Sequence, residues 1–388
     1  MQTVYLDNNA TTRVAPEVVD AMLPYLTDAY GNPSSMHQFG TKASTALKDA
    51  RERAAAFLRC KEAEVIFTSG GTEANNAAIR GVLNAAPGRR HIVTSVVEHP
   101  SVLEVFKHLE GTGYRVTYLG VNREGVIDLE ELEEAVADET AIVSLMYANN
   151  ETGVIFPLEK IVEIVKHKDI LLHTDAVQAA GKLPLDMSTV DVDLLTLSGH
   201  KLHAPKGVGL LYVRRGTRIR PFIIGGGQER GRRSGTENIP HIVGLGRALE
   251  LAERHTPAAA NEMRRLRDKL EDAILSQIPI AVRNGAKDAR IPNTSNLSFD
   301  GLEGEAILLM MDEMGICASS GSACSTGALE PSHVLRAMGL AGSLSQGSVR
   351  FSLSRYTTED EIDSVIKELP PIVRRLGELS GPAFSTKG

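Results

Sequence analysis

The chain has 388 residues, a formal net charge of −7 and an ordinary globular composition, with 42% hydrophobic and 23% charged residues. Its one short basic stretch, RRSG at 232–235, is too small to favour nucleic acid as a partner. No apolar run approaches the ~20 residues that span a bilayer, the N-terminus lacks a signal-peptide pattern, and the three cysteines have no disulfide or metal-site spacing. We therefore expect a soluble cytoplasmic protein that contacts neither membrane nor nucleic acid.

Short apolar runs alternate with amphipathic segments up to about residue 255. This alternation is typical of βαβ units and predicts an α/β fold with a mainly parallel sheet. The last two apolar runs are close together, so one of these strands is expected to be antiparallel. The predicted strands are residues 64–68, 91–95, 115–120, 141–147, 170–174, 194–199 and 207–213, and the predicted helices are 16–26, 42–58, 128–136 and segments that begin at Thr72, after Pro100 and after Pro157.

The pattern changes beyond about residue 255, where a smaller α+β region is expected. A chain of this length exceeds a comfortable single core, so two domains are predicted. The large α/β domain is assigned to residues 13–255, and the small α+β domain to residues 1–12 with 256–388. The elements expected in the small domain are a charged helix over 261–278, strands at 280–285 and 293–299, helices at 304–315 and 331–339, a strand at 348–355 and a terminal helix from Glu359.

Lys201, in the polar loop SGHKLHAPKG, carries the most chemical information in this chain. It follows one predicted strand, while Asp175 ends another. A lysine amine forms a Schiff base with the aldehyde of pyridoxal phosphate (PLP), and a buried carboxylate pairs with the pyridine nitrogen so that the ring accepts electrons. A single lysine is far more often a solvated surface charge, so this interpretation depends on the surrounding residues.

Several of those residues suit a phosphate group. Gly71 and Thr72 lie between a predicted strand and a predicted helix, where free backbone N–H groups favour an anion. Ser198 and His200 precede Lys201 and could donate to the same phosphate. A small-residue turn without a ligand explains the glycines about equally well.

Four further polar residues follow predicted strands or lie within one. His99 could stack on the PLP ring or move protons, although most single histidines are merely packed. Asn150 could bind a substrate carboxylate or the ring oxygen, and a turn role is its alternative. Gln178 could reach the ring oxygen. Arg350 is the best candidate for binding a carboxylate, because a guanidinium matches it bidentately; an exposed strand arginine is the alternative.

Cys324 lies in CASSGSACSTGALEPSH, a segment of small residues with little to pack, and is expected to be exposed and mobile. Most free cysteines are buried and inert, and Cys317 and Cys60 are expected to be of that kind. An unperturbed thiol has a pKa of about 8.5, so a nucleophilic Cys324 needs a nearby base or cation, for which His99 is a candidate.

At this point the chain resembles the cysteine desulfurases of the NifS/IscS family, which are fold-type I PLP enzymes related to aspartate aminotransferase. The resemblance covers nearly the whole chain, and its short C-terminus is more similar to the nitrogenase-associated NifS type. The segments that carry it are YLDNNATT, GNPSSMHQFG, FTSGGTEANN, VEHPSV, NNETG, HTDAVQ, SGHKLHAPKG, GGGQERGRRSGTEN, SSGSACSTGALEPSHVLRAMG and SVRFSLSR.

The resemblance implies a role for each candidate residue. Lys201, Cys324 and His99 would be catalytic, with Cys324 forming a persulfide and also serving as a possible transient iron–sulfur ligand. Asn150 and Arg350 would bind the carboxylate of L-cysteine. Thr236 would reach the phosphate from a second subunit, which implies a homodimer. The implied PLP-binding residues are Lys201, Gly71, Thr72, His99, Asp175, Gln178, Ser198, His200 and Thr236.

The implied activity is conversion of L-cysteine to L-alanine with transfer of sulfur to Cys324. The sulfur would then pass to a scaffold protein for iron–sulfur cluster assembly, in a nitrogen-fixation or a housekeeping context. Three alternatives stay open at this point: a PLP aminotransferase, in which Cys324 would be idle; a selenocysteine lyase; and a non-catalytic sulfur-carrier scaffold.

Overall fold

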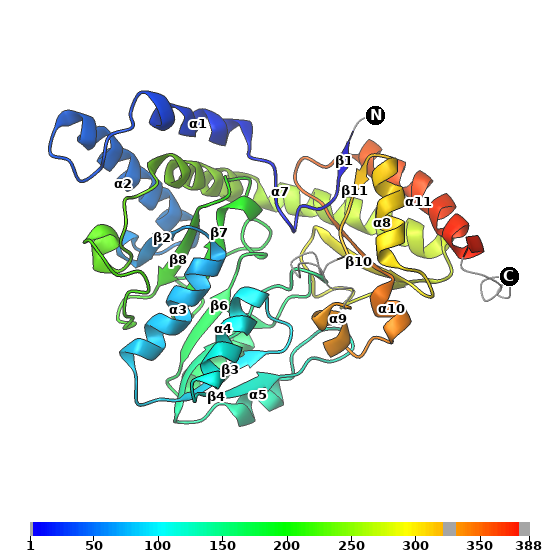
Figure 1. Ribbon diagram of the computed structural model, residues 1–388, viewed down its shortest axis with the longest axis horizontal. Coiled ribbons are helices and arrows are strands. Elements are labelled where there is room, and N and C mark those ends of the chain that lie inside the picture. Colours follow the sequence, from blue (N-terminus) through cyan, green and yellow to red (C-terminus); the bar gives the residue numbers. More distant parts are fainter. Residues whose placement is uncertain (1–2, 321–330, 380–388) are drawn as a thin grey trace.

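The computed structural model describes residues 3–320 and 331–379. Figure 1 shows two regions, each built around its own sheet, with the long helix α7 (Ile239–Gln277) running from one to the other. The helices and strands of the larger region precede α7 in the sequence. Among the described residues, no helix is long and apolar enough to cross a membrane.

The larger sheet has the strand order β2-β8-β7-β6-β5-β3-β4 within the described part of the chain. All its neighbours pair in parallel except β8, which is antiparallel to both β2 and β7. This confirms the predicted α/β fold and the expected antiparallel strand. The strands are β2 (Val65–Thr68), β3 (His91–Ser95), β4 (Arg115–Leu119), β5 (Thr140–Ser144), β6 (Leu171–Asp175), β7 (Leu194–Ser198) and β8 (Gly209–Val213).

Helices cover both faces of this sheet, so its central strands are buried throughout and have continuous apolar sequences. Helices α3 and α4 pack on one face through residues such as Ile79 and Phe106. Helices α2, α6 and the first half of α7 pack on the other face. The helices before α7 are α1 (Pro16–Thr27), α2 (Gln38–Leu58), α3 (Gly71–Ala85), α4 (Pro100–Gly111), α5 (Leu129–Ala135) and α6 (Leu158–His167).

Helix α7 is longer than the sequence pattern predicts. The predicted charged helix over 261–278 is its second half, and the first half, from Ile239, was missed. Pro240 occupies the first turn, where its missing N–H costs nothing, and Pro257 lies inside the helix. The domain boundary predicted near residue 255 therefore falls within a continuous helix.

The smaller region has a three-stranded antiparallel sheet in the order β12-β10-β9. Its separate core includes Leu6, Leu270 of α7, Phe299 and Phe351. Cys317, which was expected in the core at the end of a helix, instead lies in β11 and is only partly buried. β1 and the elements after α7 are β1 (Val4–Tyr5), β9 (Ala281–Arg283), β10 (Thr294–Phe299), α8 (Gly304–Glu313), β11 (Ile316–Cys317), α9 (His333–Ala337), α10 (Gly342–Gln346), β12 (Ser348–Ser352) and α11 (Glu359–Leu379). Of these, α9 packs through Val334 and Leu335 into the core of the larger region.

Candidate active site

A cavity of about 180 Å³ lies where β6 and β7 end, at the carboxyl edge of the large sheet. This is the edge at which open α/β sheets bind ligands. The cavity brings together residues from Asn9 to Arg350, far apart in the sequence. The candidate residues that line it are Gly71, Thr72, His99, Asn150, Asp175, Gln178, Ser198, His200, Lys201 and Arg350.

The pairing of β6 with β7 places Lys201 and Asp175 on the same cavity. Asp175 is the last residue of β6 and lies opposite Thr196 of the parallel strand β7. Lys201 follows Thr196 within the short 3-10 turn Gly199–Lys201. Because neighbouring parallel strands end at one sheet edge, both side chains reach the cavity from that edge.

Asp175 is held as an acceptor. Its carboxylate accepts 2.8 Å from Asn75 Nδ2 and 3.0 Å from the backbone N–H of Val177. The same Asn75 amide donates 2.9 Å to Ser101 Oγ. Asp175 also lines the cavity, where a carboxylate could pair with a protonated ring nitrogen.

The Lys201 amine contacts the N-terminal segment of the chain. Its Nζ donates to the backbone carbonyls of Asn9 and Ala10, the latter at 2.7 Å. The Asn9 side chain in turn donates 2.8 Å to Thr294 Oγ1 of β10. The segment that follows β1 therefore forms one wall of the cavity and links it to the smaller sheet.

His99 is the N-cap of α4, immediately before Pro100. Its Nδ1 accepts 3.1 Å from the backbone N–H of Ser101, so the proton of the neutral ring is on Nε2. Burial lowers the pKa of His99, and the Lys201 charge lowers it further, while Asp175 opposes the shift. The imidazole is therefore neutral at neutral pH.

The part of the cavity at the start of α3 suits an anion. Gly70 has φ +154° and precedes α3, which begins at Gly71 with its first backbone N–H groups free of helical acceptors. A Cβ on Gly71 would lie 3.1 Å from Val177 Cγ2, so this turn is tightly packed. Burial, with the nearby Lys201 charge, lowers the pKa of His200 to about 4, so its imidazole is neutral.

Arg350 reaches the cavity from β12 of the smaller sheet and is only 2% exposed. It donates 2.7 Å to Asp7 Oδ1 and 3.0 Å to the carbonyl of Asn150. Its Nε is buried and has no hydrogen-bond partner among the described residues. The alternative of a solvent-exposed strand arginine is therefore wrong, and the guanidinium keeps a donor for a ligand.

Two candidate residues are not part of this constellation. Cys324 lies outside the described residues, so neither its nucleophilic role nor the proposed activation by His99 is tested, and the same holds for its iron–sulfur ligation. Thr236 is exposed and does not line the cavity of its own chain. Within the described ranges, no group of three or more His, Cys, Asp or Glu side chains is arranged to hold a metal ion.

The cavity also has polar lining residues that the sequence did not single out, namely Asn9, Asn75 and Ser101. Asn75 stands four residues after Gly71, one helical turn into α3, and Ser101 stands two residues after His99. Their positions near the starts of α3 and α4 were the feature of the sequence that could have marked Asn75 and Ser101 as site residues. Their hydrogen-bond partners come from other elements and could not be read from the chain.

The lining residues fit PLP. The Lys201 amine matches the aldehyde, Asp175 matches the pyridine nitrogen, and the N-terminus of α3 with Ser198 and His200 matches the phosphate. Asn75 Oδ1 is buried without a partner among the described residues, as expected where a ligand completes the hydrogen bonding.

Comparisons with known proteins agree with this geometry. Residues 4–365 match the family described as aminotransferase class-V. The chain is 59% identical over 380 residues to the cysteine desulfurase of Trichormus azollae, covering 98% of this chain and 95% of that protein. It is 52% identical over 389 residues to cysteine desulfurase NifS of Azotobacter vinelandii, covering 100% and 96%. A solved NifS-like protein superposes with a TM-score of 0.92 at 41% identity, covering 97% of this chain and 100% of that one.

Proposed function

The chain belongs to the cysteine desulfurase family of class-V aminotransferases, and on that premise we propose that it converts L-cysteine to L-alanine and passes the sulfur to Cys324. The observation that carries the proposal is the convergence of Lys201, Asp175 and Arg350 on one cavity. An amine, a carboxylate and a guanidinium there can hold PLP and an amino acid together. A location in the cytoplasm remains the prediction from the sequence.

The lining residues would divide the holding of the cofactor between them. Lys201 would bind the aldehyde carbon of PLP, and Asp175 would pair with the pyridine nitrogen. Gln178 would donate to the ring oxygen, and the neutral imidazole of His99 would stack on the ring. The phosphate would be held by the α3 N-terminus at Gly71 and Thr72, together with Ser198 and His200. When bound, PLP stabilises negative charge at the α-carbon of the substrate.

The residues of the chain then divide the chemistry between them. Arg350 and Asn150 bind the substrate carboxylate and orient the α-hydrogen. The Lys201 amine takes the α-proton at Nζ and later returns a proton to the substrate. The Cys324 thiolate attacks the sulfur of cysteine, so a new S–S bond forms while the Cβ–S bond breaks. The products are alanine and a persulfide on Cys324.

Both flanks of the segment that carries Cys324 are attached beside the cavity. Ser319 pairs with Arg350, whose backbone N–H donates 2.6 Å to the Ser319 carbonyl. On the other side, Ser332 caps α9 and donates to buried Glu151, the neighbour of Asn150. Cys324 stands four positions after Ser320 in the sequence. The attachment of both flanks beside the cavity supports the role of Cys324.

A homodimer is part of the proposal. Val19, Leu23 and Leu26 expose about half of their surface along α1, and Ile224 is 84% exposed. The segment containing Ile224 is hydrogen-bonded to Ser234, two residues before Thr236. Exposed apolar side chains of this extent mark association surfaces. In the dimer, Thr236 would contact the phosphate of the partner's PLP.

The sulfur acceptor is proposed to be a scaffold protein that assembles iron–sulfur clusters, including those of nitrogenase. A persulfide is a carrier, so a second protein has to take its sulfur. A pull-down in which candidate scaffolds bind the enzyme equally with and without cysteine would argue against transfer through a specific complex.

The function is tested by a visible spectrum of the purified protein before and after L-cysteine, with alanine and sulfide measured together in the presence of a thiol reductant. Lys201→Ala should abolish both the PLP absorbance change and turnover. Cys324→Ser should keep the absorbance change and lose sulfide release. Cys60→Ser is the matched control, because burial raises the pKa of the Cys60 thiol to about 12 and makes it inert.

Full sulfide release by Cys324→Ser would contradict the assignment of the nucleophile. Production of pyruvate from alanine with a keto-acid acceptor would instead identify an aminotransferase. A large preference for selenocysteine over cysteine would identify a selenocysteine lyase.

A further inference from the structure

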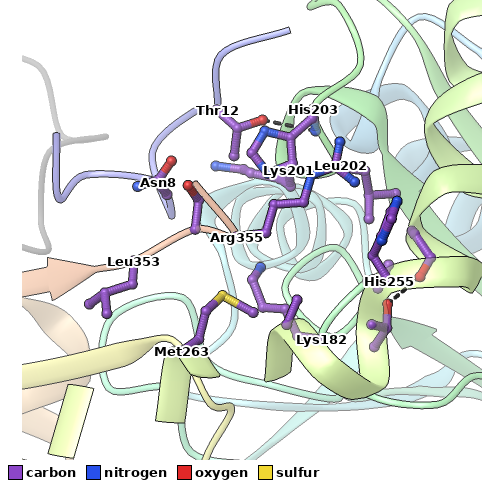
Figure 2. A pocket seen from close by; sticks show the side chains of 16 residues that line it. Asn8, Thr12, Lys182, Lys201, Leu202, His203, His255, Met263, Leu353 and Arg355 are labelled. Atoms are coloured by element: carbon purple, nitrogen blue, oxygen red, sulfur yellow. Dashed lines mark hydrogen bonds between the residues drawn. The ribbon is translucent and has the colours of Figure 1, made fainter. Parts of the chain in front are cut away.

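Lys182 is a buried lysine directly behind the PLP cavity. It is 8% exposed and lines a second, smaller cavity of about 40 Å³, drawn in Figure 2. Lys201 lines both cavities, whereas Gln178 lines only the larger one and Lys182 only the smaller one. The two cavities are thus separated by a wall to which Gln178 and Lys182 both belong.

A hydrogen-bonded chain crosses this wall. Lys182 Nζ donates 3.0 Å to the backbone carbonyl of Gln178 and 3.2 Å to its side-chain Oε1. Gln178 Nε2 donates 3.1 Å to the carbonyl of Asn9, which also accepts from Lys201 Nζ. Lys182 is therefore connected to the lysine of the active site through one side-chain amide.

Lys182 has no compensating carboxylate among the residues that the structure describes. A buried lysine without an ion pair is costly. Burial, together with the charges of Lys201 and Arg350, lowers the pKa of Lys182 to about 7. The ammonium and the neutral amine both have at least two N–H donors, so the bonds to Gln178 hold in either form. A buried donor without an ion pair at this position calls for a role beyond packing.

The direction of the Gln178 amide follows from what Lys182 can do. In its ammonium form Lys182 only donates, so this form selects the oxygen end of the amide. The NH₂ end is then turned toward Asn9 and the cofactor cavity. One of its two hydrogens goes to the Asn9 carbonyl, which leaves the second as a donor on the cavity side.

We propose that Lys182 is a positioning residue that locks the Gln178 side chain with its N–H toward the cofactor, so that it donates to the ring oxygen of PLP. This inference rests on the proposed function, since it assumes that PLP occupies the cavity. A flipped Gln178 would present its oxygen to the ring oxygen, and two acceptors would face each other. Lys182 lies outside the cofactor cavity, and its hydrogen bond to Gln178 Oε1 excludes the flipped orientation.

The test is a titration of the full-length protein with PLP, following the visible absorbance of the bound form across pH 6 to 9. Lys182→Met removes the donor while keeping a long apolar side chain, and should weaken PLP affinity about 3- to 10-fold, as expected for one lost hydrogen bond. It should also change the pH dependence of the absorbance band. Lys182→Arg keeps a donor, for which the adjoining cavity has room, and should restore both properties.

A double-mutant cycle separates positioning from general stability. Lys182→Met should have little effect on PLP affinity in a Gln178→Ala background, because the amide that it orients is gone. Lys166→Met is the matched control: Lys166 of α6 is partly buried and pairs with Asp193 away from the cavity. This control should lower the thermal midpoint and leave the PLP band unchanged.

Three results would overturn the inference. The first is unchanged PLP affinity in Lys182→Met. The second is an equal loss of affinity when Lys182→Met is made in the Gln178→Ala background. The third is a Lys182→Arg variant that folds but does not restore PLP affinity and the pH dependence of the band. A wild-type protein that binds no PLP would instead defeat the proposed function itself, so the two failures are distinguishable.

Discussion

The side-chain amide of Asn75 donates a hydrogen bond of 2.8 Å to the carboxylate of Asp175. Asn75 lies in the first turns of α3 and Asp175 at the end of β6, 100 residues apart in sequence. The helix whose first residues, Gly71 and Thr72, line the cavity therefore also holds the Asp175 carboxylate. One rigid element links the proposed phosphate site to the carboxylate proposed to pair with the pyridine nitrogen.

Asn75→Ala should therefore weaken PLP binding. Hydrogen bonds to charged groups contribute about 1.5–3 kcal/mol, which corresponds to roughly a 10- to 100-fold loss of affinity. Asn76→Ala is the control, because among the described residues the Asn76 side chain bonds to the Thr72 carbonyl within the same helix. Absorbance titration with PLP measures both. Equal affinity in the two variants would show that the bond to Asp175 does not matter.

Arg350→Gln should raise the KM for L-cysteine about 10- to 100-fold with a much smaller change in kcat, because it removes a charged contact to the substrate carboxylate. Arg283→Gln, in β9 of the same sheet, removes a partly exposed guanidinium paired with Glu271 and serves as the control. Steady-state alanine formation gives both constants. A drop in kcat at unchanged KM would contradict substrate binding by Arg350.

Glu98 gives a pH prediction. Its side chain is fully buried, and burial raises its pKa to about 8. Hydrogen bonds from the Met146 N–H and from Ser95 oppose this rise in pKa. Its folded pKa exceeds the unfolded value, so the folded state binds the extra proton. The extra stability that protonated Glu98 gives the folded protein is complete below the unfolded pKa near 4.5 and is lost as the pH rises toward 8.

The Gln side chain in Glu98→Gln cannot ionise, so the loss of stability with rising pH that comes from Glu98 should be absent in this variant. Thermal midpoints of the two proteins at pH 6 and pH 8.5 measure the difference. The midpoint of wild type should fall more between these pH values than that of Glu98→Gln. Parallel declines would exclude Glu98 as the source.

Arg290→Met should destabilise the protein by up to about 3–5 kcal/mol, because it removes the bidentate partner of the buried Glu271 charge and leaves it to the partly exposed Arg283 at 3.3 Å. Arg290 and Glu271 form a bidentate pair at 2.6 Å, and both side chains are 2% exposed. Arg265→Met removes an exposed pair with Glu262 and should shift the denaturant midpoint far less. The double variant Arg290→Met/Glu271→Met should recover much of the stability. No recovery would mean that packing, rather than the unpaired charge, causes the loss.

The sequence predicted the large sheet well because its strands are buried on both faces. Their continuous apolar runs stand out between amphipathic helices. The first half of α7 was missed because Pro257 interrupts the helical pattern locally, while packing of α7 across both cores keeps the helix continuous. Cys317 was misplaced for a similar reason, since its strand β11 exists only by pairing with β1.

The site residues with distinctive chemistry were predicted, whereas their supporting residues were not. Lys201, Asp175 and His99 stand beside strand ends in recognisable motifs. Asn75 reads as one more polar residue of a helix, and Lys182, in AAGKLPL, reads as a surface lysine. Their partners Asp175 and Gln178 are reached through space, so no local pattern marks them.

The order of residues along the chain was enough to determine the fold class and the family and to single out the lysine proposed to bind PLP, because strand ends and helix starts are local features of sequence. Folding alone decided which hydrogen bonds Asp175 accepts, which way the Gln178 amide faces and that Arg350 is buried beside Asp7. Those properties depend on distances between elements, and such distances are fixed only when the two cores pack.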